Sequence, residues 1–448
     1  MLDLNSKVVE IEKKYNVQNL KFNELSIWSF LRKSYQLEEE KGLILTSNQV
    51  HVNYDNIPLT KKIANIFFGF RGWFNKYDYI CFFNIKKKIV LGNEYLEIPL
   101  SNLISKLDSN SILYVDQHPR HYPKESSGLR KCSSLSFLLL IKVIYTFFYK
   151  IISPRVNFES KLLSQINDTY KIQVDYREAV SNFIIESKFY YFYLKIYSPR
   201  GIFFQDYSIN QPLIYAAKKL SIKTVEISHG IIYQEMPQYF FQKKLNSDFF
   251  PNCICVYTKN EKKMLDSSIN NNYDAVELIQ REFLPFLKGI QKTSEANNIL
   301  FGYRNTISVS TQFPVEDEVA LFIKKCALID DSIGWFISIR HFRSSYYDKF
   351  NFPSNIYIVN NCYDYMINTN IHASVYSTCI AEANYIGKKV ILINIHNLSK
   401  KYLGKYENNL DIFIANTPSE FIEYVDTESF HTKSFYNCNH ENNNFFLD

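Results

Sequence analysis

The stretch GIFFQDYSINQPLIYAAKKLSIKTVEISHG, residues 201–230, decides the fold of this chain. It opens with a short apolar run at 201–204, continues with a helix-like segment at 212–220 and closes with a β-branched run at 223–227. A strand, a helix and a second strand in this order are typical of a parallel βα arrangement. We therefore expect an α/β fold organised around this unit.

Polar residues follow both strands of this unit. Asp206 comes after the first strand, and His229 with Gly230 comes after the second. Because ligands of open α/β sheets bind beyond the carboxyl ends of the strands, we expect chemistry at Asp206 and His229, and Gly230 permits a turn that other residues resist. Glu235 also lies beyond a strand end and is the reserve candidate. The structural alternatives are a cap or turn for Asp206 and a core position for His229.

Length and composition indicate a globular protein of two or three domains. At 448 residues the chain exceeds one ordinary core, and 46% hydrophobic against 21% charged residues is globular. The net charge of +6 is modest and dispersed, with no zinc-finger spacing or arginine-rich run, so we expect no nucleic-acid partner. Eight scattered cysteines without a CxxC pair indicate a reduced, cytoplasmic protein, and the N-terminus has no apolar signal-peptide core.

Two apolar segments also carry basic residues: IANIFFGFRGW at 63–73 and LSFLLLIKVIYTFFYKIIS at 135–153. The second is borderline in length for a membrane span and contains Lys142 and Lys150. We therefore expect a buried or interfacial helix there rather than a crossing. Internal packing and peripheral contact with the inner membrane are the two alternatives.

The alternation of strands and helices continues through the chain. The first half predicts helices up to about residue 45, strands at 77–85 and 111–119, and a helical region at 160–197. The second half predicts strands at 253–257, 298–303, 335–343, 355–360, 372–377 and 388–395, with helices from Thr258 or Asn260, at 315–329, at 378–387 and at 419–424. This pattern predicts two Rossmann-like domains facing a central cleft, at 1–285 with helical additions and at 286–448, joined by a polar linker at 288–298.

A basic cluster in the second half is suited to phosphate. Arg340, His341 and Arg343 leave the end of one predicted strand together. An imidazole flanked by guanidinium groups brings charge-assisted donors onto an anion. The structural alternative is a solvated, charged turn.

A second phosphate candidate lies at a predicted helix start. Ser377 and Thr378 place two hydroxyls beside the free N–H groups of that start, which together form an anion site. Glu382, one turn further along, is placed to accept hydrogen bonds from ribose hydroxyls, and Gly387 ends the helix. The structural alternatives are ordinary helix caps and a solvent-facing Glu382.

The order of these motifs resembles one enzyme family over about residues 201–395. SVYSTCIAEANYIGKKVILIN at 374–394 is similar to the donor-binding half of GT-B glycosyltransferases and related nucleotide-sugar enzymes. ISIRHFR at 337–343 stands where bacterial sialyltransferases and Kdo transferases carry a His-Pro motif, with Phe342 in place of the proline. TVEISHGII at 224–232 is similar to the ELQHG segment of bacterial capsule and lipopolysaccharide glycosyltransferases, with Ser228 in place of the glutamine.

This resemblance implies a glycosyltransferase with a nucleotide-sugar donor and a glycan or lipid-linked glycan acceptor of a bacterial surface polysaccharide. It implies donor-phosphate contacts from His341, Ser377 and Thr378, a ribose contact from Glu382, and a place near the transferred sugar for His229 and Gly230. Asp206 is the candidate catalytic carboxylate, as the base of an inverting enzyme or the nucleophile of a retaining one.

The same resemblance implies that neither a metal nor a further cofactor takes part, and no DxD-like pair stands where a metal site needs one. A CMP-linked ulosonic acid such as Kdo is the first expectation for the donor, and a UDP-hexose is the second. Two other function classes stay open. One is another nucleotide-sugar enzyme, such as a 2-epimerase or a polyol-phosphate transferase, and the other is a non-catalytic polysaccharide-assembly protein.

Overall fold

The chain folds into two compact units. The computed structural model describes residues 7–46, 60, 63, 66–67, 70–83, 88–91, 94–97, 111–116, 132–152, 158–228, 230, 232, 236, 238–268, 271–278, 302–312, 315–338, 344–359, 362–403 and 412–427. The first unit comprises residues 3–88 and 97–279, and the second comprises residues 1–2, 89–96 and 280–448. The predicted boundary at 285/286 and the predicted linker lie outside the described residues.

The first unit is built on a seven-stranded parallel sheet. Its strands are β3 (Tyr79–Phe83), β6 (Ile112–Asp116), β7 (Cys132–Ser134), β8 (Gly201–Phe204), β9 (Lys223–Ile227), β10 (Cys253–Val256) and β11 (Ala275–Leu278). Their order is β11-β10-β9-β8-β3-β6-β7, so the strand order reverses between β3 and β8. Strands β8 and β10 are buried along their whole length, which is why they read as continuous apolar runs.

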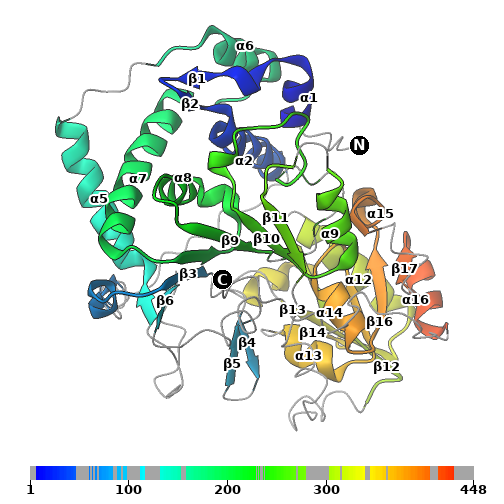
Figure 1. Ribbon diagram of the computed structural model, residues 1–448. Coiled ribbons are helices and arrows are strands. Elements are labelled where there is room, and N and C mark those ends of the chain that lie inside the picture. Colours follow the sequence, from blue (N-terminus) through cyan, green and yellow to red (C-terminus); the bar gives the residue numbers. More distant parts are fainter. Residues whose placement is uncertain are drawn as a thin grey trace. The chain divides into compact units, whose positions relative to one another are not determined.

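Helices cover this sheet in successive layers. They are α1 (Lys7–Lys14), α2 (Trp28–Thr46), α5 (Leu135–Ile152), α6 (Lys161–Tyr170), α7 (Tyr176–Tyr197), α8 (Gln211–Lys219) and α9 (Lys259–Asp266), with short 3-10 helices η1 (Val17–Asn19), η2 (Phe70–Phe74), η6 (Tyr207–Ile209) and η7 (Ser247–Phe249). Helix α8 packs on β9, α7 on α8, and α2 on α7 (Figure 1). The Phe30 ring of α2 stacks on the Phe183 ring of α7, with centroids 4.0 Å apart. The aromatic content of this half of the chain is therefore largely core.

The prediction that the N-terminal region is helical throughout is wrong at residues 21–26, which form a β-hairpin. A two-residue turn joins β1 (Lys21–Phe22) to β2 (Leu25–Ser26) as an antiparallel hairpin between α1 and α2. Asn23 and Glu24 form the turn at φ values of 48° and 42°, the left-handed pair that a tight hairpin turn requires. The predicted helical region at 160–197 is likewise two helices, because Lys171 at φ 52° ends α6 before α7 begins.

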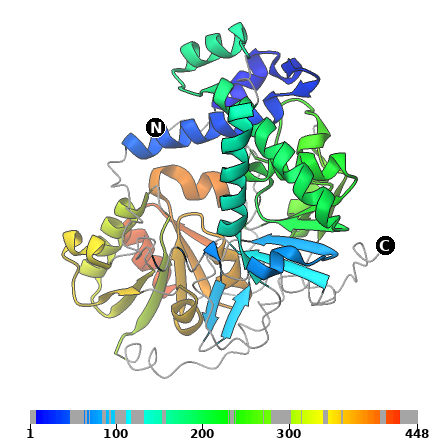
Figure 2. The ribbon, with the colours of Figure 1, turned by 90° about the vertical axis from the view of Figure 1, so that its left-hand side faces the viewer.

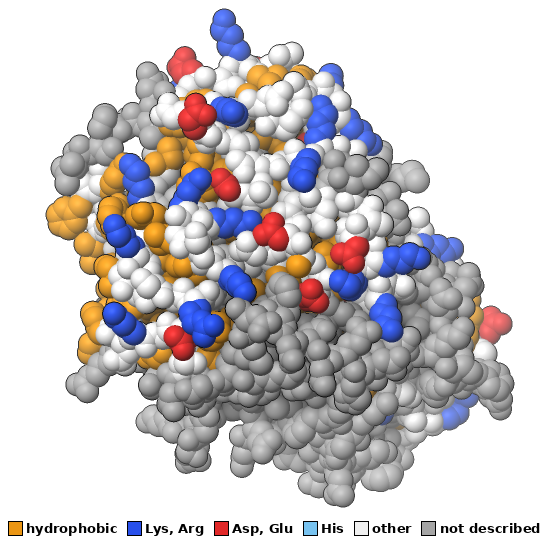
Figure 3. Space-filling model, in the orientation of Figure 1, with side chains coloured by type: hydrophobic (Ala, Val, Ile, Leu, Met, Phe, Trp, Pro, Cys, Tyr) orange, Lys and Arg blue, Asp and Glu red, His pale blue; other side chains and the backbone are white. Residues whose placement is uncertain are grey.

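Helix α5 confirms the expectation of a helix at 135–152, and several of its large apolar side chains are exposed. Among the described residues, no helix is both long and apolar enough to cross a bilayer. The large apolar side chains exposed on it are Leu139, Ile141, Val143, Ile144, Phe147 and Phe148, which we call the α5 surface. Helix α5 packs against α7 and faces the viewer in Figure 2. Figure 3 shows hydrophobic side chains gathered with lysines and arginines along α5 and α7.

The second unit contains a six-stranded parallel sheet in the order β14-β13-β12-β15-β16-β17. Its strands are β12 (Asn305–Ser310), β13 (Ile333–Ser338), β14 (Ile356–Val359), β15 (Ile371–Ser374), β16 (Lys389–Ile393) and β17 (Ile412–Ala415). Numbered along the chain, this order is 3-2-1-4-5-6, the Rossmann order. An additional two-stranded sheet pairs β4 (Lys88–Leu91) with β5 (Glu94–Glu97).

The helices of the second unit pack in two groups on its sheet. They are α12 (Glu316–Ile329), α13 (Cys362–Asn368), α14 (Cys379–Tyr385), α15 (Leu398–Leu403) and α16 (Pro418–Asp426), with 3-10 helices η9 (Ser344–Phe350) and η10 (Ile395–Asn397). Helices α12 and α16 pack on each other and on β13 and β17, whereas α13 and α14 pack on β12 and β15. The predicted α/β class with two Rossmann-like domains is thus confirmed. A cleft between the domains stays a prediction.

The central strand of the second sheet is not the predicted one. Of the predicted strand at 298–303, the described residues 302 and 303 are not in a strand, and β12 follows at 305–310. The sequence of β12, NTISVS, has a polar residue at alternate positions, yet Thr306, Ser308 and Ser310 are all buried. Polar side chains are tolerated inside a sheet when each finds a hydrogen-bond partner, and β12 meets this condition. Strands β11 and β17 were also not predicted.

Candidate functional site

The first candidate site lies where the strand order of the first sheet reverses. Asp206 follows β8 by two residues, and β8 pairs with β3 on one side and β9 on the other. In doubly wound sheets this reversal opens a crevice at the carboxyl ends of the strands, and ligands bind there. The structure therefore places Asp206 at the position in the first unit where a ligand is expected.

The Asp206 carboxylate is held by the turn that it caps. Asp206 has φ 57°, and its Oδ1 accepts a hydrogen bond from the Ser208 backbone N–H at 3.0 Å and another from the Ser208 hydroxyl. Asn210 Nδ2 donates to the Asp206 carbonyl at 3.0 Å. The side chain caps η6, so the predicted capping alternative is observed, and it is only half-buried. A capped, half-buried carboxylate has a fixed orientation and stays in reach of solvent.

Glu226 is a second carboxyl at this site, and it was not predicted. It lies on β9, opposite Phe204, and its side chain is completely buried. Burial, and then the negative charge of Asp206, raise the pKa of Glu226 to about 8, although hydrogen bonding from Tyr239 and from the backbone N–H groups of Tyr207 and Asp206 opposes the increase. A glutamate inside the β-branched run 223–227 was the available signal, because such runs are usually apolar.

Aromatic side chains enclose the Glu226 carboxyl. The Tyr239 hydroxyl donates to Glu226 Oε1 at 2.8 Å. Burial, and then the neighbouring Glu226, raise the pKa of Tyr239 well above its ordinary value, so the phenol stays a donor. The Tyr207 ring packs against Tyr239 and Phe250 at centroid distances of 6.0 and 5.3 Å. This apolar wall is the reason that ionisation of Glu226 is costly.

The loop after β9 is tied to the neighbouring strand and helix. Ser228 donates its backbone N–H to the Cys255 carbonyl at 2.9 Å and its hydroxyl to the Gly230 carbonyl at 2.6 Å. The buried Glu261 carboxylate of α9 accepts from the Ile232 backbone N–H at 2.7 Å. His229 and Glu235, the two other predicted residues of this loop, lie outside the described residues, so their predicted roles stay predictions.

The second candidate site lies at the strand reversal of the second sheet, between β12 and β15. A ladder of buried polar side chains joins these two strands. His372 Nδ1 and Nε2 hydrogen-bond to the hydroxyls of Ser308 and Ser310 at 2.9 and 3.2 Å. The Ser374 hydroxyl donates to the Ser310 carbonyl at 2.6 Å and to Gln312 Oε1 at 3.1 Å. Burial lowers the pKa of His372 to about 3, so its imidazole is neutral at physiological pH.

The predicted phosphate and ribose residues follow β15 directly. Ser377 Oγ accepts a hydrogen bond from the Cys379 backbone N–H at 3.3 Å, and Thr378 precedes α14. The Glu382 side chain is buried rather than solvent-facing, and its Oε2 accepts from the Tyr363 hydroxyl at 2.7 Å. Gly387 follows α14 at φ 81°, as expected for a glycine that ends a helix.

The predicted basic cluster lies beyond the described part of β13. Strand β13 ends at Ser338, and Arg340, His341 and Arg343 lie outside the described residues. Within the described ranges, no three His, Cys, Asp or Glu side chains are grouped as a metal site requires. The expectation that no cofactor is needed stays a prediction.

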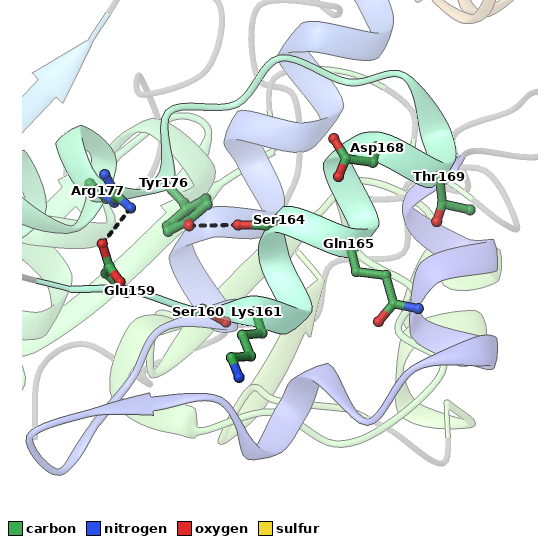
Figure 4. A pocket seen from close by; sticks show the side chains of 9 residues that line it. All are labelled: Glu159, Ser160, Lys161, Ser164, Gln165, Asp168, Thr169, Tyr176 and Arg177. Carbon is green, nitrogen blue, oxygen red and sulfur yellow. Dashed lines mark hydrogen bonds and ion pairs between the residues drawn. The ribbon is translucent and has the colours of Figure 1, made fainter.

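Two surface pockets of the first unit were also considered as sites. Figure 4 shows the first, a hollow of about 410 Å³ between α6 and the start of α7, in which Arg177 pairs with Glu159 at 2.9 Å and Ser164 with Tyr176 at 3.0 Å. Its one ion pair is exposed, and its lining residues all lie away from the sheet reversal. The second, of about 400 Å³, is bounded by α2, α7 and the start of α8, and Ser208 lines it. Only the second therefore adjoins the Asp206 turn.

Comparison with known proteins gives structural similarity at low sequence identity. The chain matches no protein-family model and no curated protein sequence. It is similar to UDP-GlcNAc 2-epimerase from Neisseria meningitidis bound to UDP-GlcNAc, at 12% identity and a TM-score of 0.46, over 78% of this chain and 90% of that one. It is also similar to the calicheamicin glycosyltransferase CalG4, at 12% identity and a TM-score of 0.43 over 79% and 90% of the two chains. The wall teichoic acid polymerase TagF is similar at 10% identity and a TM-score of 0.44, over 78% and 79%. At these identities and TM-scores, no residue role passes from these proteins to this chain.

Proposed function

We propose that this protein is a nucleotide-sugar enzyme. The leading candidate for its reaction is glycosyl transfer. The observation that carries the proposal is the pair of parallel sheets, each reversing its strand order beside polar side chains. Asp206 stands at the reversal of the first sheet, and Ser310 with Ser374 at that of the second. Crevices of this kind bind nucleotides and their conjugates.

In the transferase reading, Asp206 acts on the acceptor hydroxyl. A carboxylate held in one orientation by Ser208 and still within reach of solvent is suited to accept a proton from a bound hydroxyl. The donor binds in the second unit, with its phosphates at Ser377 and Thr378 and its ribose at Glu382. The ribose role of Glu382 follows the resemblance alone, since its buried carboxylate already accepts from the Tyr363 hydroxyl.

The second candidate is a sugar-nucleotide epimerase, and Glu226 is the observation that favours it. Inversion at a carbon removes a proton from one face and returns one to the other, which requires both a base and an acid. Asp206 and the neighbouring Glu226, whose pKa is raised by burial, are the two carboxyls that could form such a pair. The full burial of Glu226 favours the transferase, because a buried acid does not reach a substrate carbon directly.

The first donor to test is a UDP-linked sugar. The CMP-Kdo expectation depended on His341 and on the His229–Gly230 segment. Both histidines lie outside the described residues, so that expectation stays a prediction. UDP-GlcNAc is the ligand of the similar epimerase and is the natural first probe. CMP-Kdo remains in the screen as the second probe.

The experiment incubates the protein with each donor in D₂O, with and without glycan acceptors, and follows the sugar by proton NMR. With UDP-GlcNAc, a transferase releases the nucleotide and leaves the C2 hydrogen unexchanged, whereas a 2-epimerase produces the C2 epimer with deuterium at C2. With CMP-Kdo, whose C2 carries no hydrogen, transfer is followed by the release of CMP. We expect Asp206→Asn to lose turnover and keep donor binding in calorimetry, and Ser377→Ala to weaken donor binding. Glu159→Gln, at the exposed ion pair of Figure 4, is the control. Absence of binding by UDP-GlcNAc, CMP-Kdo, UDP, CMP, GDP and CDP would reject the proposal.

We further propose that the protein is cytoplasmic and meets a lipid-linked acceptor through the α5 surface. Val143 and Phe147 are 62% and 63% exposed. The charged residues of α5 are Lys150, which is exposed, and Lys142, which pairs with Glu186 of α7 at 3.0 Å. The helix itself has no acidic residue, which suits an anionic membrane surface. Phe70 and Phe74 of η2 extend the apolar area, because their rings pack on Phe137 of α5 at 6.1 and 6.3 Å.

Flotation with liposomes of mixed neutral and anionic phospholipid tests this contact. We expect the protein to float and the double variant Phe147→Ser, Phe148→Ser to remain at the bottom. Leu328→Ser is the matched control, because Leu328 is an exposed apolar residue of α12 in the second unit. Equal flotation of the protein and the double variant would refute the contact.

A further inference from the structure

The Glu226 carboxyl lies beside the turn that carries Asp206. Glu226 is in register with Phe204 of β8 and with Ile254 of β10, and Asp206 follows Phe204 by two residues. Glu226 Oε1 accepts from Tyr239 at 2.8 Å, whereas Glu226 Oε2, although buried, forms no hydrogen bond of good geometry with the residues that the structure describes, and the backbone N–H groups of Asp206 and Tyr207 only approach the carboxyl. A buried carboxyl oxygen without a donor is unfavourable as a carboxylate and acceptable as part of a neutral acid.

No cation among the described residues acts on Glu226. The titratable groups that act on it or face it are Asp206 after β8, Tyr207 of η6, Tyr239 and Tyr273 from the following segments, and Cys255 of β10. The nearest buried cation, Arg32 of α2, acts on Tyr207 and Tyr273 and is paired with Glu12 at 2.7 Å. Each of the phenols has its pKa raised by burial, so each is neutral around pH 7.

We propose that Glu226 is a positioning residue for Asp206: as a neutral acid it fills the floor of the site and leaves Asp206 as the charged member of this pair of carboxyls. This inference rests on the proposed function of Asp206. Two neighbouring carboxyls in an apolar site do not both ionise readily, and the more buried one keeps its proton. The environment therefore assigns the charge to Asp206, the carboxyl that solvent and substrate reach.

Ionisation of Glu226 then limits activity on the alkaline side. Above about pH 8 a second carboxylate would appear beside Asp206, repel it, and repel an anionic sugar nucleotide. Glu226→Gln preserves an acceptor for Tyr239 and cannot ionise. We expect this variant to keep at least about half of kcat at pH 7 and to lose the alkaline decline of kcat seen in the unmodified protein. A decline at the same pH in both proteins would overturn the proposal.

A measurement without substrate separates this inference from the proposed function. Infrared difference spectra at pH 7 should show the carbonyl band of a protonated carboxylic acid in the unmodified protein and its loss in Glu226→Gln. If the band is absent, the inference is wrong whatever reaction the enzyme catalyses. If the band is present and no donor binds, the neutral state of Glu226 holds and the function proposed for Asp206 fails, which also overturns the positioning role.

A second variant keeps the test decisive if Glu226→Gln does not fold. Tyr239→Phe removes the hydroxyl that donates to Glu226 Oε1 and leaves the glutamate in place. Because that hydrogen bond lowers the pKa of Glu226, its loss should move both the alkaline decline of kcat and the loss of the infrared band to higher pH. An unchanged pH for these two transitions, or a move to lower pH, would contradict the inference.

Discussion

His372 makes the stability of the second unit depend on pH in a predictable way. The imidazole is completely buried between Ser308 and Ser310, and burial lowers its pKa from 6.5 to about 3. In the unfolded chain it takes up a proton near pH 6.5, whereas in the folded chain it does so only near pH 3. The unfolded state therefore binds more protons between these values, and the stability from the neutral His372 is lost as pH falls through this window.

The size of the effect follows from the two pKa values. At pH 5 the unfolded imidazole lies about 1.5 pH units below its pKa of 6.5, which corresponds to about 2 kcal/mol of stability lost relative to pH 7.5. His372→Gln removes this proton uptake. The variant is less stable at both pH values, because it disturbs a buried hydrogen-bonded ladder, but its loss between pH 7.5 and pH 5 should be smaller by about 2 kcal/mol.

Hydrogen exchange measured by mass spectrometry on peptides covering β12 and β15 reports the stability of this unit alone. His396→Gln is the matched control, because His396 is an exposed histidine of the same unit, and it should follow the unmodified protein. If His372→Gln loses as much stability as the unmodified protein between the two pH values, the burial of a neutral imidazole at this position is refuted.

Three further predictions concern stability and are measured as urea unfolding free energies. Arg32→Met leaves the buried Glu12 carboxylate without its cation and should cost about 3–5 kcal/mol, and a cost below about 1 kcal/mol would mean that the pair is hydrated. Thr258→Ala removes one half of the capping box that Thr258 forms with Glu261 at the start of α9 and should cost about 1 kcal/mol, unless that helix start frays in the unmodified protein. In Gly387→Ala the added methyl group meets no atom within 4 Å, but the residue must adopt φ 81°, so the variant should cost about 1–2 kcal/mol. Gly302→Ala is the control, because its site is also open and has no such φ; an equal cost there would mean that the loss comes from the glycine's backbone freedom and not from the left-handed conformation.

Local pattern was sufficient for the elements whose stability is largely local. Strands β8 and β9 and helix α8 were predicted because fully buried parallel strands read as apolar or β-branched runs. Helix α9 was predicted to begin with a cap at Thr258 or Asn260, and the structure shows that Thr258 is the cap and forms a capping box with Glu261. The position of Asp206 after β8 followed from the same reasoning.

The elements that were missed depend on partners far away in the chain. Strand β12 reads as polar, and it is a buried strand because His372, 64 residues from Ser308, satisfies its serine hydroxyls. The hairpin at 21–26 was missed because its turn requires two left-handed residues, which Asn23 and Glu24 signal only weakly.

The sequence by itself determined the α/β class, the βαβ unit and the candidate carboxylate Asp206, because burial on both faces of a strand and capping of a turn are written in neighbouring residues. Tertiary structure alone decided the strand order, and hence that Asp206 lies at one reversal and His372 with Ser310 at the other. It also decided that Glu226 is buried, with its pKa raised by burial to about 8, rather than exposed at the surface. The physical reason is that strand pairing and desolvation depend on which distant segments come together, and spacing along the chain does not record this.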